Sequence, residues 1–161
     1  MTDAPVHGAG GCGQCGAIPR GGLSCREAFD ELLAFEFADR EAFGPVHHLT
    51  VACYYLQHPS GYRDEVRTVW RQLISAPEGG REYAVSTMAE MRETFDGATR
   101  VREAGHEPPA WWPRAWPHTA IDALPTDDSD RTAASHVRRM RAWAASVRSA
   151  LDIAEEGAHS P

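Results

Sequence analysis

The sequence predicts an all-α fold, a single compact bundle of about five helices. Apolar residues recur every three or four positions in several segments, and no segment shows a convincing alternation of apolar and polar residues. The chain has 161 residues, 42% of them hydrophobic and 24% charged, which suits one globular domain. We expect a flexible N-terminus over residues 1–11, the helical domain over 12–154 and a flexible tail over 155–161.

A glycine-rich loop over residues 12–25 contains three of the four cysteines. Cys12 and Cys15 form a Cys-x-x-Cys pair followed by glycine, which is typical of a zinc knuckle, because glycines let backbone amides turn toward the sulfurs. A redox pair is the alternative, but such a motif follows a strand, and no β-branched apolar run precedes Cys12. We therefore expect zinc, although residue types alone do not separate zinc from iron at a thiolate-rich site.

The next element expected is an antiparallel helical hairpin over residues 25–58. Its first helix runs from Cys25 to about Phe37, where apolar residues repeat at helical spacing. Its second helix starts near Pro45, a residue suited to a first helical turn, and ends before Pro59. The short connection between them favours antiparallel packing.

The spacing of polar residues along the hairpin predicts which of them meet. Cys25 and Glu36 are eleven residues apart, and so are His47 and His58. Eleven residues make about three turns and ~16 Å, so each pair lies on one helix face. In an antiparallel hairpin Cys25 then falls near His58, and Glu36 near His47. We expect His58 to be the fourth ligand of a tetrahedral site, with His47 as the alternative, beside Cys12, Cys15 and Cys25.

A carboxylate beside an imidazole is expected at Glu36 and His47. Such a carboxylate holds the ring in one tautomer and favours its charged form. A structural hydrogen-bonded pair and a catalytic or second-metal pair both remain open. Cys53 lies about 140° round the helix from His58 and is expected to be a small buried hydrophobe. His48 points about 100° away from His47 and is expected at the surface.

Further helices are expected over residues 62–105, the second of them with an apolar stripe of Val85, Met88, Met91 and Phe95. Residues 106–126 are rich in proline and tryptophan and cannot form a helix interior. Their tryptophans are expected to cover the core, with a binding surface of Trp111, Trp112 and Trp116 as the alternative. A last helix is expected over residues 127–154, with an arginine-rich face exposed to solvent.

Composition and charge exclude several classes of function. No apolar run approaches the ~20 residues of a membrane span, so we expect no membrane partner. The net charge of -7 argues against general nucleic-acid binding. All 16 basic residues are arginine, which excludes a Schiff-base or P-loop lysine. The N-terminus lacks a basic region followed by an apolar core, so we expect a cytoplasmic protein with a protein or small-molecule partner of unknown identity.

The sequence resembles the domain of unknown function 5946 family, small proteins common in GC-rich bacteria. The resemblance is strong over residues 12–61 and weaker over 136–151. Its motifs here are Cys12-x-x-Cys15-Gly16, Cys25 with the helix to Glu36, Val46-His47-x-Leu49-Thr50-Val51-x-x-Tyr54-x-x-Gln57-His58-Pro59 and Val137-x-x-x-Arg141-Ala142-Trp143-Ala144-x-x-Val147. The family pattern has both His47 and His58, and it often has glutamine at His48 and alanine at Cys53. The resemblance implies a module rather than a reaction.

These observations favour a small zinc-binding helical protein that serves as an interaction or accessory module. One alternative is a metal-dependent or acid–base enzyme that uses Glu36 and His47, for example in a biosynthetic pathway. A water-filled cleft at His47 would favour this enzyme, and a dry, packed pair would favour structure. The other alternative is a thiol redox switch, in which oxidation of Cys12 and Cys15 releases the metal.

Overall fold

The computed structural model describes residues 10–75, 81–95 and 103–160, with only some of the side chains in residues 81–95. Within these residues every regular element is a helix, and an isolated bridge between Arg20 and Leu23 is the one β-type pairing. The predicted all-α class is therefore confirmed. In this part of the chain, no helix combines the length and the apolarity that a bilayer crossing requires.

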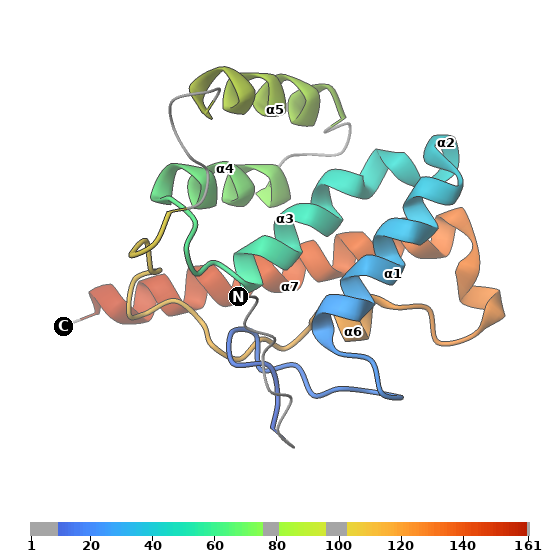
Figure 1. Cartoon of the computed structure of the whole chain (residues 1–161), viewed down its shortest axis with the longest axis horizontal. Coiled ribbons are helices and arrows are strands. Elements are labelled where there is room, and N and C mark those ends of the chain that lie inside the picture. Colours follow the sequence, from blue (N-terminus) through green and yellow to red (C-terminus); the bar gives the residue numbers. More distant parts are fainter. Residues whose placement is uncertain (1–9, 76–80, 96–102, 161) are drawn as a thin grey trace.

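The predicted hairpin consists of α1 (Cys25–Ala38) and α3 (His47–Gln57), which run antiparallel (Figure 1). Helix α1 begins with a capping box, in which Ser24 and Glu27 each accept a hydrogen bond from the other's backbone amide. The connection contains two short elements that the sequence analysis did not predict, α2 (Arg40–Phe43) and η1 (Gly44–Val46). They let the chain reverse direction within one compact turn.

The remaining long helices follow α3 along the chain. They are α4 (Asp64–Ser75), α5 (Arg81–Phe95) and α7 (Ala133–His159). Helix α3 contacts both α4 and α7, and α5 contacts α4 at the outside of the bundle (Figure 1). The expected inward stripe of α5 is wrong at Val85, which is 64% exposed. The side chains of Met88, Met91 and Phe95 lie outside the described residues.

The core lies where α1, α3, α4 and α7 meet. Its largest fully buried apolar side chains come from α1, α3 and α7, namely Phe29, Leu32, Leu56, Met140, Trp143 and Leu151. On α1 and α7 these residues recur at helical spacing, so the periodicity of the sequence identifies the buried faces of those two helices.

The proline- and tryptophan-rich segment covers one end of this core. Its tryptophans therefore cover the core, as expected, and do not form the alternative binding surface. Trp112 and Trp116 are buried, and the Trp112 indole donates a hydrogen bond to the carbonyl of Leu56 at 3.0 Å. The segment also contains one short helix, α6 (Ala120–Ala123), which contacts α1.

One buried arginine connects this segment to the rest of the bundle. Arg67 of α4 is 3% exposed. Its guanidinium donates to Asp64 and to four backbone carbonyls on two separate segments, those of Pro59, Tyr62, His106 and Glu107. Residues 59–62 and 106–107 are thereby held together.

The last helix differs from its expected bounds at both ends. Residues Asp128–Arg131 form a separate turn of 3-10 helix, η2, and α7 starts after Thr132, whose side chain accepts from the backbone amide of Ser135. The helix continues to His159 instead of ending at residue 154. Arg71 of α4 pairs with Glu155 at 2.7 Å, so the first residue of the expected tail contacts the bundle, whereas residues 156–160 are helical or extended but exposed. Most of the expected flexible N-terminus lies outside the described residues.

Candidate metal centre

The glycine-rich loop forms a tight turn around Cys12 and Cys15. The backbone amide of Gly16 donates to the carbonyl of Cys12 at 2.8 Å, and the amide of Cys12 donates to Ala17 at 2.9 Å. Gly16 adopts a positive φ of 73°, which favours glycine. A Cβ atom there would approach the Cα of Ala115 to 3.2 Å, so the loop also packs closely against the proline- and tryptophan-rich segment.

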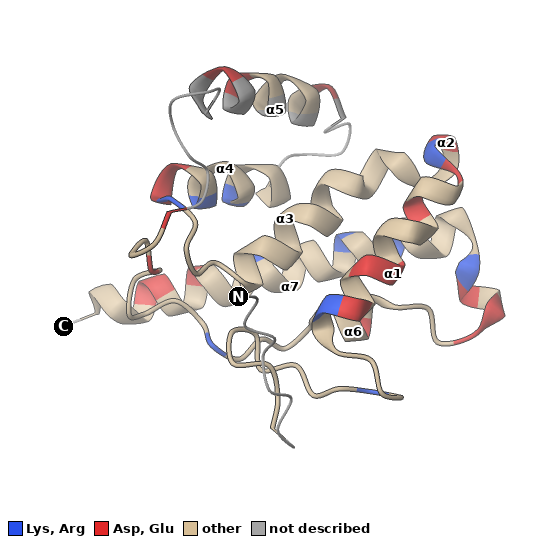
Figure 2. Ribbon diagram, in the orientation of Figure 1, with Lys and Arg blue, Asp and Glu red and all other residues tan. Residues whose placement is uncertain are grey.

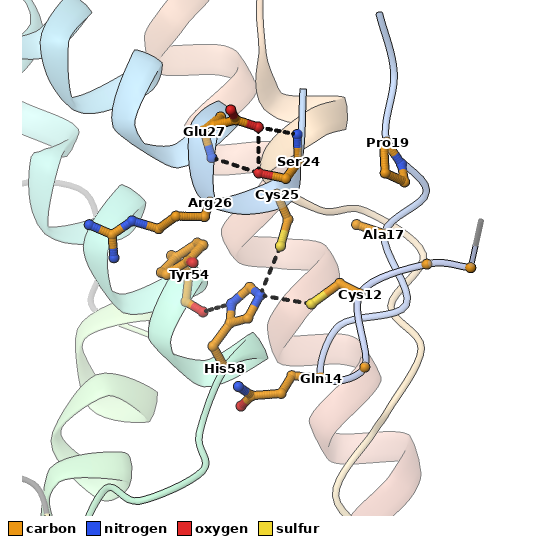
Figure 3. Close-up of a pocket in the computed structure, with 13 residues that line it drawn as sticks. Cys12, Gln14, Ala17, Pro19, Ser24, Cys25, Arg26, Glu27, Tyr54 and His58 are labelled. Carbon is orange, nitrogen blue, oxygen red and sulfur yellow. Dashed lines mark hydrogen bonds between the residues drawn. The ribbon is translucent and has the colours of Figure 1, made fainter. Parts of the chain in front are cut away.

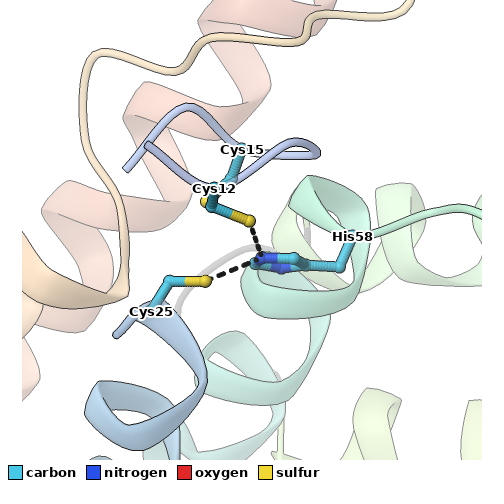
Figure 4. A group of neighbouring side chains, drawn as sticks. All are labelled: Cys12, Cys15, Cys25 and His58. Carbon is cyan, nitrogen blue, oxygen red and sulfur yellow. Dashed lines mark hydrogen bonds between the residues drawn. The ribbon is translucent and has the colours of Figure 1, made fainter. Parts of the chain in front are cut away.

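His58 approaches the cysteines from the C-terminal end of α3. Its Nδ1 donates to the carbonyl of Tyr54 at 2.7 Å, so its Nε2 is the nitrogen that could bind a metal once it has lost its proton. That Nε2 lies 3.3 Å from Cys25 Sγ and 3.6 Å from Cys12 Sγ (Figure 4). The ring stacks on Tyr54, with centroids 4.1 Å apart, and Tyr54 stacks in turn on Phe29. The orientation of the imidazole is therefore fixed before any ligand binds.

The four donor atoms lie close enough together to share a metal ion. The ligand atoms of Cys12, Cys15, Cys25 and His58 all lie within 4.8 Å of one another. A tetrahedral ion with bonds of about 2.3 Å to sulfur and 2.0 Å to nitrogen needs sulfur–nitrogen separations of roughly 3.5 Å. The observed 3.3 and 3.6 Å lie on either side of that value. These residues could therefore hold a metal ion.

The cluster's protons are shared between the donors. Hydrogen bonds from Cys15, Cys25 and His58 hold the pKa of Cys12 far below its ordinary value. The pKa of Cys15 is raised instead, chiefly by its hydrogen bond to Cys12. Burial lowers the pKa of His58, but contacts with Cys12 and Cys25 outweigh burial and raise it to about 9. Negative charge thus gathers on sulfur opposite a cationic ring, and a divalent cation would displace the shared protons.

The second polar cluster lies at the other end of the hairpin, around Glu36. His47 Nδ1 donates to Glu36 Oε2 at 2.7 Å, which confirms that these two residues meet. His47 is therefore not brought to the cysteines. Thr50 also donates to Glu36. Burial would raise the pKa of Glu36, but hydrogen bonds from His136, His47 and Thr50 leave it below its ordinary value.

His136 is the member of this cluster that sequence reasoning missed. It comes from α7, is fully buried, and donates from Nε2 to Glu36 Oε1 at 2.8 Å. Among the described residues, nothing forms a hydrogen bond with its Nδ1. The available signal was its position four residues before Met140 and seven before Trp143, on the apolar face of an amphipathic helix. A polar side chain on such a face needs a buried partner.

The two other polar residues considered on α3, Cys53 and His48, lie outside both clusters. Cys53 is fully buried, as expected of a small hydrophobe, and burial raises the pKa of its thiol. His48 is partly exposed, and burial lowers its pKa. Among the described residues, the group of Cys12, Cys15, Cys25 and His58 is the one set of three or more potential ligands close enough to share an ion.

Comparison with known proteins agrees with the motifs. A family model described as a family of unknown function, DUF5946, matches residues 10–152 of the 161-residue chain. Searches of curated proteins and of solved structures gave no significant match. The family match extends over the middle of the chain, beyond the two regions in which the motifs are recognisable. The chain therefore belongs to the DUF5946 family.

Proposed function

We propose that this protein is a small zinc-binding module, in which the metal fastens the glycine-rich loop to the helical hairpin and the protein acts through interaction with a partner. The observation that carries the proposal is the placement of His58. Its Nδ1 is fixed by the carbonyl of Tyr54, and its Nε2 faces sulfur atoms from both the loop and α1. A metal-binding histidine has this arrangement.

The donor set supports zinc over other metals. Three cysteines and one histidine are a common structural zinc set, and harder ions such as Mg²⁺ and Ca²⁺ prefer oxygen ligands. Four protein ligands leave no position for a water molecule, so the site is closed and structural. Thiolate ligands must stay reduced, and we therefore place the protein in the cytoplasm.

A structural metal has a clear task in this loop. Among residues 10–24 only Cys15 and Ala17 are buried. Apolar burial therefore contributes little to ordering the segment, and two backbone hydrogen bonds close its turn. Metal binding by zinc-finger peptides contributes on the order of 10 kcal/mol at neutral pH, which is enough to order a short loop of this kind.

The surface supports a partner other than nucleic acid. Basic and acidic positions are interspersed along the ribbon in Figure 2, and the net charge is -7. Two of the arginines on α7 have internal partners. Arg138 donates to Ser135, and Arg139 donates to the carbonyls of Ala123 and Asp130. Part of the arginine-rich face of α7 is therefore engaged in hydrogen bonds within the protein, near the N-terminal end of this helix.

Glu36 itself fits a structural role better than the role of a general base. Both oxygens of Glu36 are engaged by donors from α3 and α7, and its side chain is 1% exposed. A general base needs a lone pair free to reach a substrate. In this cluster only His47, with 39% of its side chain exposed, retains access to solvent.

Metal analysis of the purified, untagged protein tests the proposal. We expect about one zinc ion per chain, as a closed four-ligand site requires, and a clear fall in melting temperature after chelation. His58→Ala should lose the metal, whereas His48→Ala, at a neighbouring histidine outside the ligand cluster, should keep it. A protein without metal, or one whose melting temperature is unchanged by metal removal, would overturn the proposal.

A further inference from the structure

A cavity of about 790 Å³ opens beside the ligand cluster (Figure 3). Small-molecule sites have volumes of roughly 300 to 1,000 Å³ and mostly apolar walls with a few polar groups. Much of this wall is apolar, formed by glycines of the loop together with Ala17, Pro19 and the ring of Tyr54. A purely structural metal site does not need such a space.

The cavity reaches the ligand cluster at one sulfur in particular. Cys12 and Cys25 both line it, but Cys25 is only 8% exposed, whereas Cys12 is partly open to solvent. Cys15 is fully buried and does not line the cavity. Cys12 is therefore the thiol that a molecule in this cavity would meet.

The charges around the cavity select against anions. This step rests on the proposed function, because three thiolates and a neutral imidazole around Zn²⁺ sum to a charge of about -1. Glu27 adds a carboxylate to the wall. The one cationic side chain in the wall, Arg26, is paired with Asp30 at 3.1 Å. The apolar wall penalises any charged group, and the negative charges penalise an anion most, so a neutral ligand with an apolar body fits this surrounding best.

We propose that this cavity binds a neutral, mainly apolar molecule with an electrophilic carbon, and that Cys12 Sγ is the nucleophile that adds to it. With an activated alkene, the sulfur lone pair forms the new S–C bond. The π electrons of the alkene move to the neighbouring carbon, which takes a proton from water. The product is a thioether, and the step needs no oxidant or reductant.

Modification by N-phenylmaleimide, a neutral and apolar activated alkene, tests the inference on the full-length, metal-loaded protein. The modified residue is identified by peptide mass spectrometry, and the rate is followed against reagent concentration. We expect Cys12 to react first, with a rate that saturates, because binding precedes the reaction. The buried Cys53 serves as an internal control and should not react. A rate that rises linearly without saturation, or no preference for Cys12, would overturn the inference.

A matched pair of glycine variants shows whether the cavity is responsible. Gly13 lines the cavity and Gly157 does not, and a Cβ atom at either position meets nothing within 4 Å. Gly13→Leu should slow modification of Cys12 by about tenfold, because the new side chain occupies apolar space that the reagent needs, and Gly157→Leu should leave the rate unchanged. Gly10→Leu, at a second lining glycine, replaces Gly13→Leu if that variant does not fold. Equal rates in the lining and control variants would overturn the inference.

Metal content measured on the same samples separates the two proposals. A protein that holds zinc but shows linear kinetics would overturn only the cavity inference. A protein that lacks metal would overturn the proposed function, and the shape of the rate curve would still decide whether the cavity binds the reagent.

Discussion

Replacing Glu36 by glutamine changes one atom of the buried cluster and tests its structural role. The carboxylate accepts from His47 at one oxygen and from His136 and Thr50 at the other. A glutamine amide has one oxygen and one NH₂ group. Whichever way it is oriented, its NH₂ group faces at least one ring N–H, so a donor meets a donor.

The cost follows from the exposure of the two histidines. The side chain of His47 is 39% exposed and can turn toward water, whereas His136 has no exposed surface. The amide should therefore direct its NH₂ group to His47 and keep its oxygen for His136. Losing one hydrogen bond to a charged acceptor and leaving one donor poorly matched costs about 2 to 3 kcal/mol. We expect the free energy of unfolding at pH 7 to fall by about that amount.

Urea unfolding at a series of pH values measures this difference. The pKa of Glu36 is lowered in the folded protein, so its stabilising contribution is complete above the ordinary pKa of about 4.3 in the unfolded chain. The contribution is lost as the pH falls through the lower folded pKa. The difference between the natural protein and Glu36→Gln should therefore shrink in acid. Effects of metal loss cancel in the comparison, because both proteins carry the same ligands.

An exposed glutamate on the same helix provides the control. Glu31→Gln should change the free energy of unfolding by less than about 0.5 kcal/mol, as is usual at the surface. A Glu36→Gln protein as stable as this control at pH 7 would refute the structural interpretation. The pair of Glu36 and His47 would then again be a candidate for acid–base chemistry.

Two further substitutions test the loop and the arginine. Gly16→Ala should lower the free energy of unfolding by about 1 to 3 kcal/mol and weaken metal retention, because φ is positive there and the new Cβ meets Ala115. The control, Gly21→Ala, is also at positive φ but in open space and should cost only about 1 kcal/mol. Equal costs for the two variants in thermal melts would contradict this reasoning. Arg67→Met keeps the aliphatic stem but removes every donor to the carbonyls. Chemical denaturation should show that the free energy of unfolding falls by about 3 kcal/mol. A fall of less than about 1 kcal/mol would show that water replaces the guanidinium.

The sequence predicted the hairpin and its polar pairings because both depend on local periodicity. Equal spacings of eleven residues on two antiparallel helices require that Cys25 meet His58 and that Glu36 meet His47. His136 could not be placed in this way, because it lies one hundred residues from Glu36 and reaches it only through the packing of α7 on α3. The end of α7 was missed because its last buried residue is Leu151, and polar contacts stabilise the turns beyond it, namely the Arg71–Glu155 pair and the hydrogen bond from Ser160 to the carbonyl of Glu156.

The two polar clusters stabilise the hairpin in different ways because their surroundings differ. Around Glu36, the rings of Phe35 and Phe43 contact His136. Apolar burial and the hydrogen bonds of the Glu36 carboxylate therefore both hold α1, α3 and α7 together. Around His58, the approaching segment is a glycine-rich loop with few apolar side chains. Burial alone contributes little to ordering such a loop, and a ligand that forms several strong bonds at one point would add to it. The metal ion of the proposed function would supply those bonds, and the small side chains of the loop also leave the open space beside Cys12.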